Sequence, residues 1–152
     1  MKLDESKIID IECDHIRTLE VKKITYRDLE IYAVKRSTDY SYAQCALFDI
    51  TNKAWWCGYV EVPLDIHDLF KPRGYFDETI LDELDNPKLA HVHEGYTYAA
   101  YGIPLVLDDN QRLFIGWDYN HWPDTEDCVT YQEILKEGMK VIDSMLAPKS
   151  TG

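Results

Sequence analysis

The residues best suited to chemistry are histidines and aspartates in the second half of the chain. Four of the five histidines lie between residues 67 and 121, and Asp118 and Asp124 flank the last of them. His93, Asp118 and His121 are the predicted catalytic centre. Imidazole and carboxylate groups together bind Zn²⁺, Mn²⁺ or Fe²⁺, and a bound metal can activate water near neutral pH. Without a metal, a histidine beside an aspartate can act as an oriented general base.

The sequence leaves the use of this centre open. It is consistent with a divalent metal site, with acid–base catalysis without a metal, and with side chains that only hydrogen-bond to a ligand or within the fold. If the protein is an enzyme, these side chains favour a hydrolase, with metal-activated water or His/Asp acid–base chemistry.

Aromatic residues lie close in sequence to these polar groups. Trp56 and Tyr59 share one predicted strand, and Trp122 follows His121 directly. Aromatic faces with a few polar groups can stack a base or another planar ring. We therefore predict that these three side chains bind a ligand, with His67, Thr97 and Asp124 as further ligand-binding residues. The competing interpretation places most of the aromatic rings in the core.

Short extended segments are predicted to position these residues. Segments 18–25, 29–36, 41–50 and 54–62 are rich in Val, Ile, Tyr, Thr and Trp and are separated by polar breaks. Such segments predict an antiparallel meander, because the breaks are too short for helical crossovers. Further extended segments are expected at 91–101, 103–107 and 112–118.

Two helices are expected to complete the fold. In the long excursion over 63–90, Asp77 can cap a short helix that runs from Glu78 to Asp85. The C-terminal segment begins with a capping box, Thr130 with Glu133, and continues with apolar residues on one helical face. The predicted fold class is α+β, an antiparallel β-sheet packed by an amphipathic helix over 130–146.

The length of 152 residues predicts one domain. We divide it into an N-terminal arm or helix over 1–16, a β-meander over 17–62, the excursion over 63–90, motif-bearing strands and a loop over 91–128, and the helix over 130–146. The four cysteines form no CxxC pair and are expected to be reduced thiols.

Composition limits the classes of partner. The formal net charge of −12 disfavours binding to nucleic acid, because phosphates are repelled and no basic stripe offsets the repulsion. No apolar run approaches the length of a membrane span, and the charged N-terminus lacks a signal-peptide core. We therefore expect no membrane partner and a cytoplasmic location, and an acidic surface of this kind also suits a basic patch on another protein.

Three segments together resemble a known family. They are Trp56 to Pro63 with His67, then Val92 to Tyr98, then Phe114 to His121 with Asp124. Their order is similar to that in a family of small uncharacterised bacteriophage and prophage proteins, whose motifs run WCGYVxVPxxH, HGG(I/L)TY and GFDxxHxxD before a C-terminal helix. The resemblance covers about residues 55 to 145 and implies no activity. Glu94 stands where the family has a glycine of HGG, a residue that permits close backbone approach.

These features support two hypotheses of different class. In the first, a phage-type accessory protein binds a small nucleotide-like ligand, and holds or hydrolyses it, to counter a host defence signal in the host cytoplasm. In the second, a non-catalytic acidic interaction protein inhibits a host protein, and the His and Asp residues are structural. A convergence of His67, His93, Asp118 and His121 in one pocket would favour the first.

Overall fold

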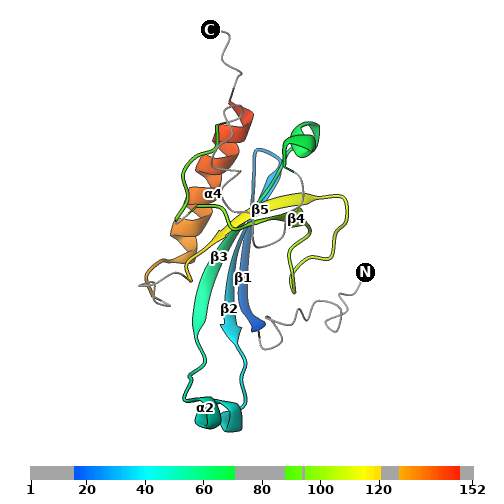
Figure 1. Ribbon diagram of the computed structural model, residues 1–152. Helices are drawn as coiled ribbons and strands as arrows, with labels where there is room; N and C mark the ends of the chain where they lie inside the picture. The colour runs from blue at the N-terminus through cyan, green and yellow to red at the C-terminus, as the bar shows by residue number, and fades with distance from the viewer. Residues whose placement is uncertain (1–15, 71–87, 94, 121–126, 148–152) are drawn as a thin grey trace.

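The computed structural model describes residues 16–70, 88–93, 95–120 and 127–147. Within these ranges the chain forms a five-stranded antiparallel sheet in the order β1-β2-β3-β5-β4. The strands are β1 Ile16–Tyr26, β2 Leu29–Thr38, β3 Ala54–Glu61, β4 Tyr98–Tyr101 and β5 Leu113–Asp118. The C-terminal helix α4, Tyr131–Leu146, packs on β1, β2 and β3 and covers one face of the sheet (Figure 1). The expected α+β fold, an antiparallel sheet with a C-terminal helix, is confirmed.

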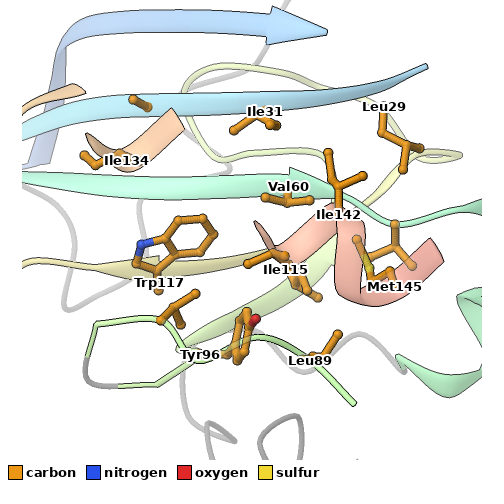
Figure 2. Packing of buried hydrophobic residues seen from close by; sticks show 14 of the residues in the cluster. Leu29, Ile31, Val60, Leu89, Tyr96, Ile115, Trp117, Ile134, Ile142 and Met145 are labelled. Carbon is orange, nitrogen blue, oxygen red and sulfur yellow. The ribbon is translucent and has the colours of Figure 1, made fainter. Parts of the chain in front are cut away.

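The two faces of the sheet carry separate apolar clusters, because successive side chains of a strand point to opposite faces. On the face that α4 covers, Ile31 of β2, Val60 of β3 and Ile115 of β5 are fully buried. Figure 2 shows Ile142 and Met145 of α4 in this cluster. The opposite face carries a second cluster that includes Val34, Cys57, Tyr59 and Phe114. Whether a residue stands at an odd or an even position along its strand therefore decides on which face of the sheet its side chain lies.

Helix α4 follows the sequence expectation closely. The Thr130 side chain accepts a hydrogen bond from the Glu133 N–H, and the Glu133 side chain accepts one from the Thr130 N–H, which completes the predicted capping box. The residues that it buries are Ile134, Leu135, Gly138, Val141, Ile142 and Met145. Neither α4 nor any other helix in the described ranges is long and apolar enough to cross a membrane.

The expected strand over 41–50 is wrong, because this segment contains helix α2, Tyr42–Phe48, at the tip of the β2–β3 hairpin (Figure 1). Its apolar side chains suggested a strand, but local capping decides the structure. Ser41 and Gln44 form a capping box, and Asp49 ends the helix in the left-handed conformation with φ of 53°. The meander consequently has three strands, β1, β2 and β3.

Three other expectations need adjustment. Among the described residues of the expected extended segment over 91–101, only Tyr98–Tyr101 form a strand. Residues 103–107 form a tight turn closed by a bridge between Ile103 and Leu107. The excursion over 63–90 begins with a 3₁₀ helix, η1, Leu64–Leu69. The helix expected from Glu78 to Asp85 lies outside the described residues.

Candidate functional site

A pocket of about 550 Å³ opens between α4 and the segment over 88–93. His91 and His93 form one wall, and Tyr119, directly after β5, lies beside them. The facing wall is a polar stripe of α4, made of Glu133, Lys136, Glu137 and Lys140. Cys128 and Val129 close the end near the start of the helix. The volume is that of a site for a small molecule.

Packing and backbone hydrogen bonds hold the histidine segment against α4. Leu89 and Val92 are buried in the core, and the Ala90 N–H donates to Ser144 Oγ of α4 at 3.0 Å. The alternate residues His91 and His93 line the pocket. Their spacing of two thus brings both residues to one cavity, although the segment is not a strand.

His93 is held in the pocket through both its ring and its backbone. Its ring stacks on Tyr119, with ring centroids 4.6 Å apart and an angle of 15° between the planes. Its backbone N–H donates to Glu137 Oε1 at 3.1 Å, and the Tyr119 hydroxyl donates to Glu137 Oε2. One carboxylate of α4 therefore fixes both the backbone of His93 and the ring on which its imidazole lies.

The Tyr119 hydroxyl is a permanent donor in this network. Burial raises its pKa, and the hydrogen bond to the Glu137 carboxylate raises it further. The hydroxyl also accepts a hydrogen bond from Trp117 Nε1 at 3.2 Å, which satisfies the buried indole N–H. The Tyr119 hydroxyl consequently stays protonated near neutral pH and ties the end of β5 to α4.

The lysines of the α4 wall differ from most other cations of the described chain. Arg17, Lys22, Lys23, Arg27 and Arg112 each form an ion pair with a carboxylate. Lys136 and Lys140 form no ion pair with a described residue. They are four positions apart and lie on the same face of α4. Their two positive charges are therefore available to a ligand in the pocket.

Asp118 lies on the other side of the sheet from His93. It pairs in register with Cys57, and directly paired residues of antiparallel strands share a face. This face is the one away from α4, whereas His93 stacks on Tyr119 in the α4 cluster. Asp118 accepts hydrogen bonds from Thr97 Oγ1 and from the Asn120 N–H, both at 3.0 Å. It thus joins Thr97, another predicted site residue, to the end of β5.

The other described candidates lie apart from the pocket. Trp56 is buried beneath α4 and packs on Tyr131, whereas Tyr59 is buried on the opposite face, where it packs on Tyr98 and accepts a hydrogen bond from Arg36. These two aromatic residues therefore do not form two walls of one cavity. His67 Nε2 donates to the Val62 carbonyl oxygen at 2.8 Å, close to the end of β3.

Three predicted site residues, His121, Trp122 and Asp124, lie outside the described residues, as does Glu94. The predicted centre of His93, Asp118 and His121 consequently stays a prediction, with its two described members on opposite faces of the sheet. Among the residues that the structure describes, no three His, Cys, Asp or Glu side chains converge closely enough to hold a metal ion.

Sequence reasoning missed the α4 wall and Tyr119. The signal was present, because residues 133, 136, 137 and 140 follow the helical spacing of three and four on a single face. A polar stripe on an amphipathic helix usually faces water, however, and nothing in the sequence alone places the segment over 88–93 beside it.

No protein-family model matches this chain, and no curated protein or solved structure matches it either.

Proposed function

We propose that the protein binds a small anionic, nucleotide-like ligand in the pocket between α4 and the segment over 88–93. The observation that carries the proposal is the pairing of two histidines with two lysines that form no ion pair with a described residue, in a cavity of about 550 Å³. The chain as a whole has a net charge of −12, so a local group of cationic and hydrogen-bonding side chains is the natural place for an anion.

Each wall has a distinct part in this binding. Lys136 and Lys140 carry the charge that attracts an anionic group, and their ammonium groups supply several donors each. His91 and His93 supply ring nitrogens that donate or accept according to tautomer. His93 is held in place before a ligand arrives, which reduces the entropy lost on binding.

Hydrolysis of the ligand is an extension of the proposal and not part of its core. His93 has the features of a positioned general base, since its ring stacks on Tyr119 and its backbone is tied to Glu137. In this extension, His93 takes a proton from the water that attacks the ligand's phosphorus, the P–O bond to the leaving alcohol breaks, and His93 returns the proton to the oxygen of that alcohol. No metal is required for that step.

The resemblance to bacteriophage and prophage proteins suggests the setting. A phage-type accessory protein that holds or destroys a small, negatively charged host defence signal would require a pocket of this kind. The proposal assigns no role to nucleic acid polymers, because the net charge of −12 repels an extended phosphate backbone.

Isothermal titration calorimetry with a panel of nucleotides tests the proposal. We expect saturable binding by the parent protein and a loss of about tenfold or more in affinity for Lys136→Ala and for Lys140→Ala, because each variant removes a charge-assisted contact. Lys53→Ala is the matched control, an exposed lysine in the loop before β3, and its affinity should equal that of the parent. Equal losses in all three variants, or no binding to any nucleotide, would contradict the proposal.

A second candidate function is inhibition of a host protein, and helix α2 favours it. This helix buries no residue, and its large apolar side chains are exposed: Tyr42 by 90%, Leu47 by 77% and Phe48 by 63%. Figure 1 shows α2 at the hairpin tip, beyond the part of the sheet that α4 covers. A capped helix that presents aromatic and aliphatic side chains suits an apolar groove of another protein.

The acidic character of the chain indicates the charge of the residues that surround such a groove on the partner. Asp39 and Asp49 flank α2, so a partner with basic residues around an apolar groove would be complementary. A photo-reactive residue at position Leu47, introduced in bacterial cells, should form one defined covalent adduct, while the same group at position Asp108 should not. Equal labelling from both positions would remove this candidate.

A further inference from the structure

The charges that line the α4 pocket indicate how many negative charges its ligand carries. Glu133, Lys136, Glu137 and Lys140 occupy one stripe of the helix and alternate in sign. Two positive charges stand beside two negative ones, so the formal sum over this wall is zero when the imidazoles are neutral. A ligand with many negative charges would meet two carboxylates as well as two ammonium groups.

Glu137 and Glu133 differ in how many of their carboxylate oxygens already accept hydrogen bonds. Glu137 uses both oxygens, one for the His93 N–H and one for the Tyr119 hydroxyl. Glu133 uses Oε1 in the capping box with Thr130, and its Oε2 accepts no hydrogen bond from a described residue. Glu133 therefore presents one acceptor to the pocket, which suits a hydroxyl or amino donor of a ligand.

From this arrangement we infer that the ligand is a phosphomonoester, of the nucleoside monophosphate class, and not a polyphosphate. This inference rests on the proposed function and names the substrate class of the same pocket. The dianionic phosphate lies between Lys136 and Lys140, and a donor group of the ligand binds Glu133 Oε2. Two lysines match a charge of −2, whereas a triphosphate brings further negative charge toward Glu133 and Glu137 in a chain of net charge −12.

The volume agrees with this class. A cavity of about 550 Å³ lies in the usual range for sites of small ligands and cofactors and accommodates a nucleoside with one phosphate. A free phosphate ion would leave most of it empty. Recognition by two permanent charges and one acceptor also predicts that a nucleoside without phosphate binds weakly, because only the acceptor is used.

The experiment compares three probes on the full chain by calorimetry without divalent cations: adenosine, adenosine monophosphate and adenosine triphosphate. If none of the adenosine compounds binds, the guanosine, cytidine and uridine series follow in the same format. We expect the monophosphate to bind about tenfold more tightly than either the nucleoside or the triphosphate, since a like-charge contact costs affinity of this order. An equal or tighter triphosphate that depends on Lys136 and Lys140 would overturn this inference and leave the proposed function standing. Absence of binding by all twelve compounds would overturn both.

Glu133→Gln supplies the sharper variant, because glutamine preserves the capping box, removes the charge and replaces the Oε2 acceptor with an amide donor. In this variant the triphosphate should bind more tightly, whereas the monophosphate loses its acceptor at Oε2 and should not, so that the ratio between the two affinities shrinks several-fold. Asp108→Asn removes one negative charge from an exposed loop before β5 and should leave the ratio unchanged. An unchanged ratio in Glu133→Gln, or an equal change in Asp108→Asn, would refute the role of Glu133 in selecting charge.

Discussion

At the scale of single residues, the Tyr119 hydroxyl is the point on which the site depends. It donates to Glu137 and accepts from the buried Trp117 indole. Tyr119→Phe leaves the indole N–H without that partner, so we expect a loss of about 1–3 kcal/mol in the free energy of unfolding. Urea denaturation measures this loss.

Tyr42→Phe is the matched control, because its side chain is 90% exposed. Its free energy of unfolding should stay within about 0.5 kcal/mol of the parent, as for most surface substitutions. A Tyr119→Phe variant as stable as the control would show that the network contributes nothing to stability.

The described cysteines should differ in reactivity. Burial raises the pKa of Cys57 to about 11, with Arg36 opposing the rise and the Asp118 charge adding to it. Since the thiolate is the reactive form, Cys57 should resist alkylation at pH 8, and exposed Cys128 should react. Peptide mapping after iodoacetamide treatment of the native protein measures both.

This contrast also bears on the site, because Cys128 lines the pocket. A bound ligand should slow alkylation of Cys128 and leave half-buried Cys45, in α2, unaffected. Alkylation of Cys57 as fast as that of Cys128 in the native protein would contradict its burial.

The sequence predicted part of the site at this scale. His93 was predicted as a site residue, and it lines the pocket together with His91. Asp118 was grouped with His93 because imidazole and carboxylate groups together suit metal binding or acid–base chemistry. The alternation of side chains along a strand separates them. Asp118 is paired with Cys57 and lies on the face away from α4, whereas the adjacent Tyr119, on which His93 stacks, lies with Trp117 on the α4 face.

At the scale of elements, Gly138 determines how closely α4 approaches the sheet. A Cβ at this position would lie 2.5 Å from Cγ2 of Ile31 and 3.3 Å from Cγ2 of Val60. Alanine favours a helix over glycine by about 1 kcal/mol, but overpacking a core typically costs about 1–3 kcal/mol. We therefore expect Gly138→Ala to lower the melting temperature.

Gln132→Ala, on the exposed first turn of α4, is the control and should melt close to the parent temperature. A Gly138→Ala variant that melts above the parent would mean that α4 lies farther from β2 than the structure places it.

The elements were predictable where local and tertiary signals agree. Thr130 with Glu133 fixed the start of α4, and its apolar face is the one that packs on the sheet. The segment over 41–50 failed because its apolar residues were assigned to a sheet, whereas in α2 they face solvent. The capping box of Ser41 with Gln44 was the signal for that helix.

At the scale of the whole molecule, ion pairs make stability depend on acid pH. Burial works to raise the pKa of Glu30, but hydrogen bonds from Tyr32 and Arg112 prevail and lower it. The hydrogen bond from Tyr26, with help from Arg27, lowers the pKa of Asp143. A carboxylate with a lowered folded pKa contributes stability above its unfolded pKa, and this stability is lost as the pH falls.

We expect the free energy of unfolding to decline as the pH falls from about 5 toward 3, in 0.15 M salt to screen the repulsion among the acidic residues. Glu30→Gln should show a shallower decline, and urea denaturation across this pH range measures both. Stability that increases on acidification would show that relief of the net charge of −12 outweighs these ion pairs.

The short extended segments and the capped amphipathic helix predicted the fold class correctly, but they did not indicate where the site lies. The pocket arises from contact between residues more than 40 positions apart, such as His93 and Glu137. Such contacts follow from tertiary packing and have no periodic trace in the sequence.

The most direct test of the central claim is an NMR titration of the imidazole resonances with adenosine monophosphate. His91 and His93 line the pocket, whereas His67 is bonded to the Val62 carbonyl oxygen near η1 and serves as the internal control. The account predicts saturable shifts of the His91 and His93 resonances, with His67 unmoved, and loss of these shifts when both Lys136 and Lys140 are replaced by alanine. Shifts of His67 equal to those of His93, or no shifts at all, would contradict it.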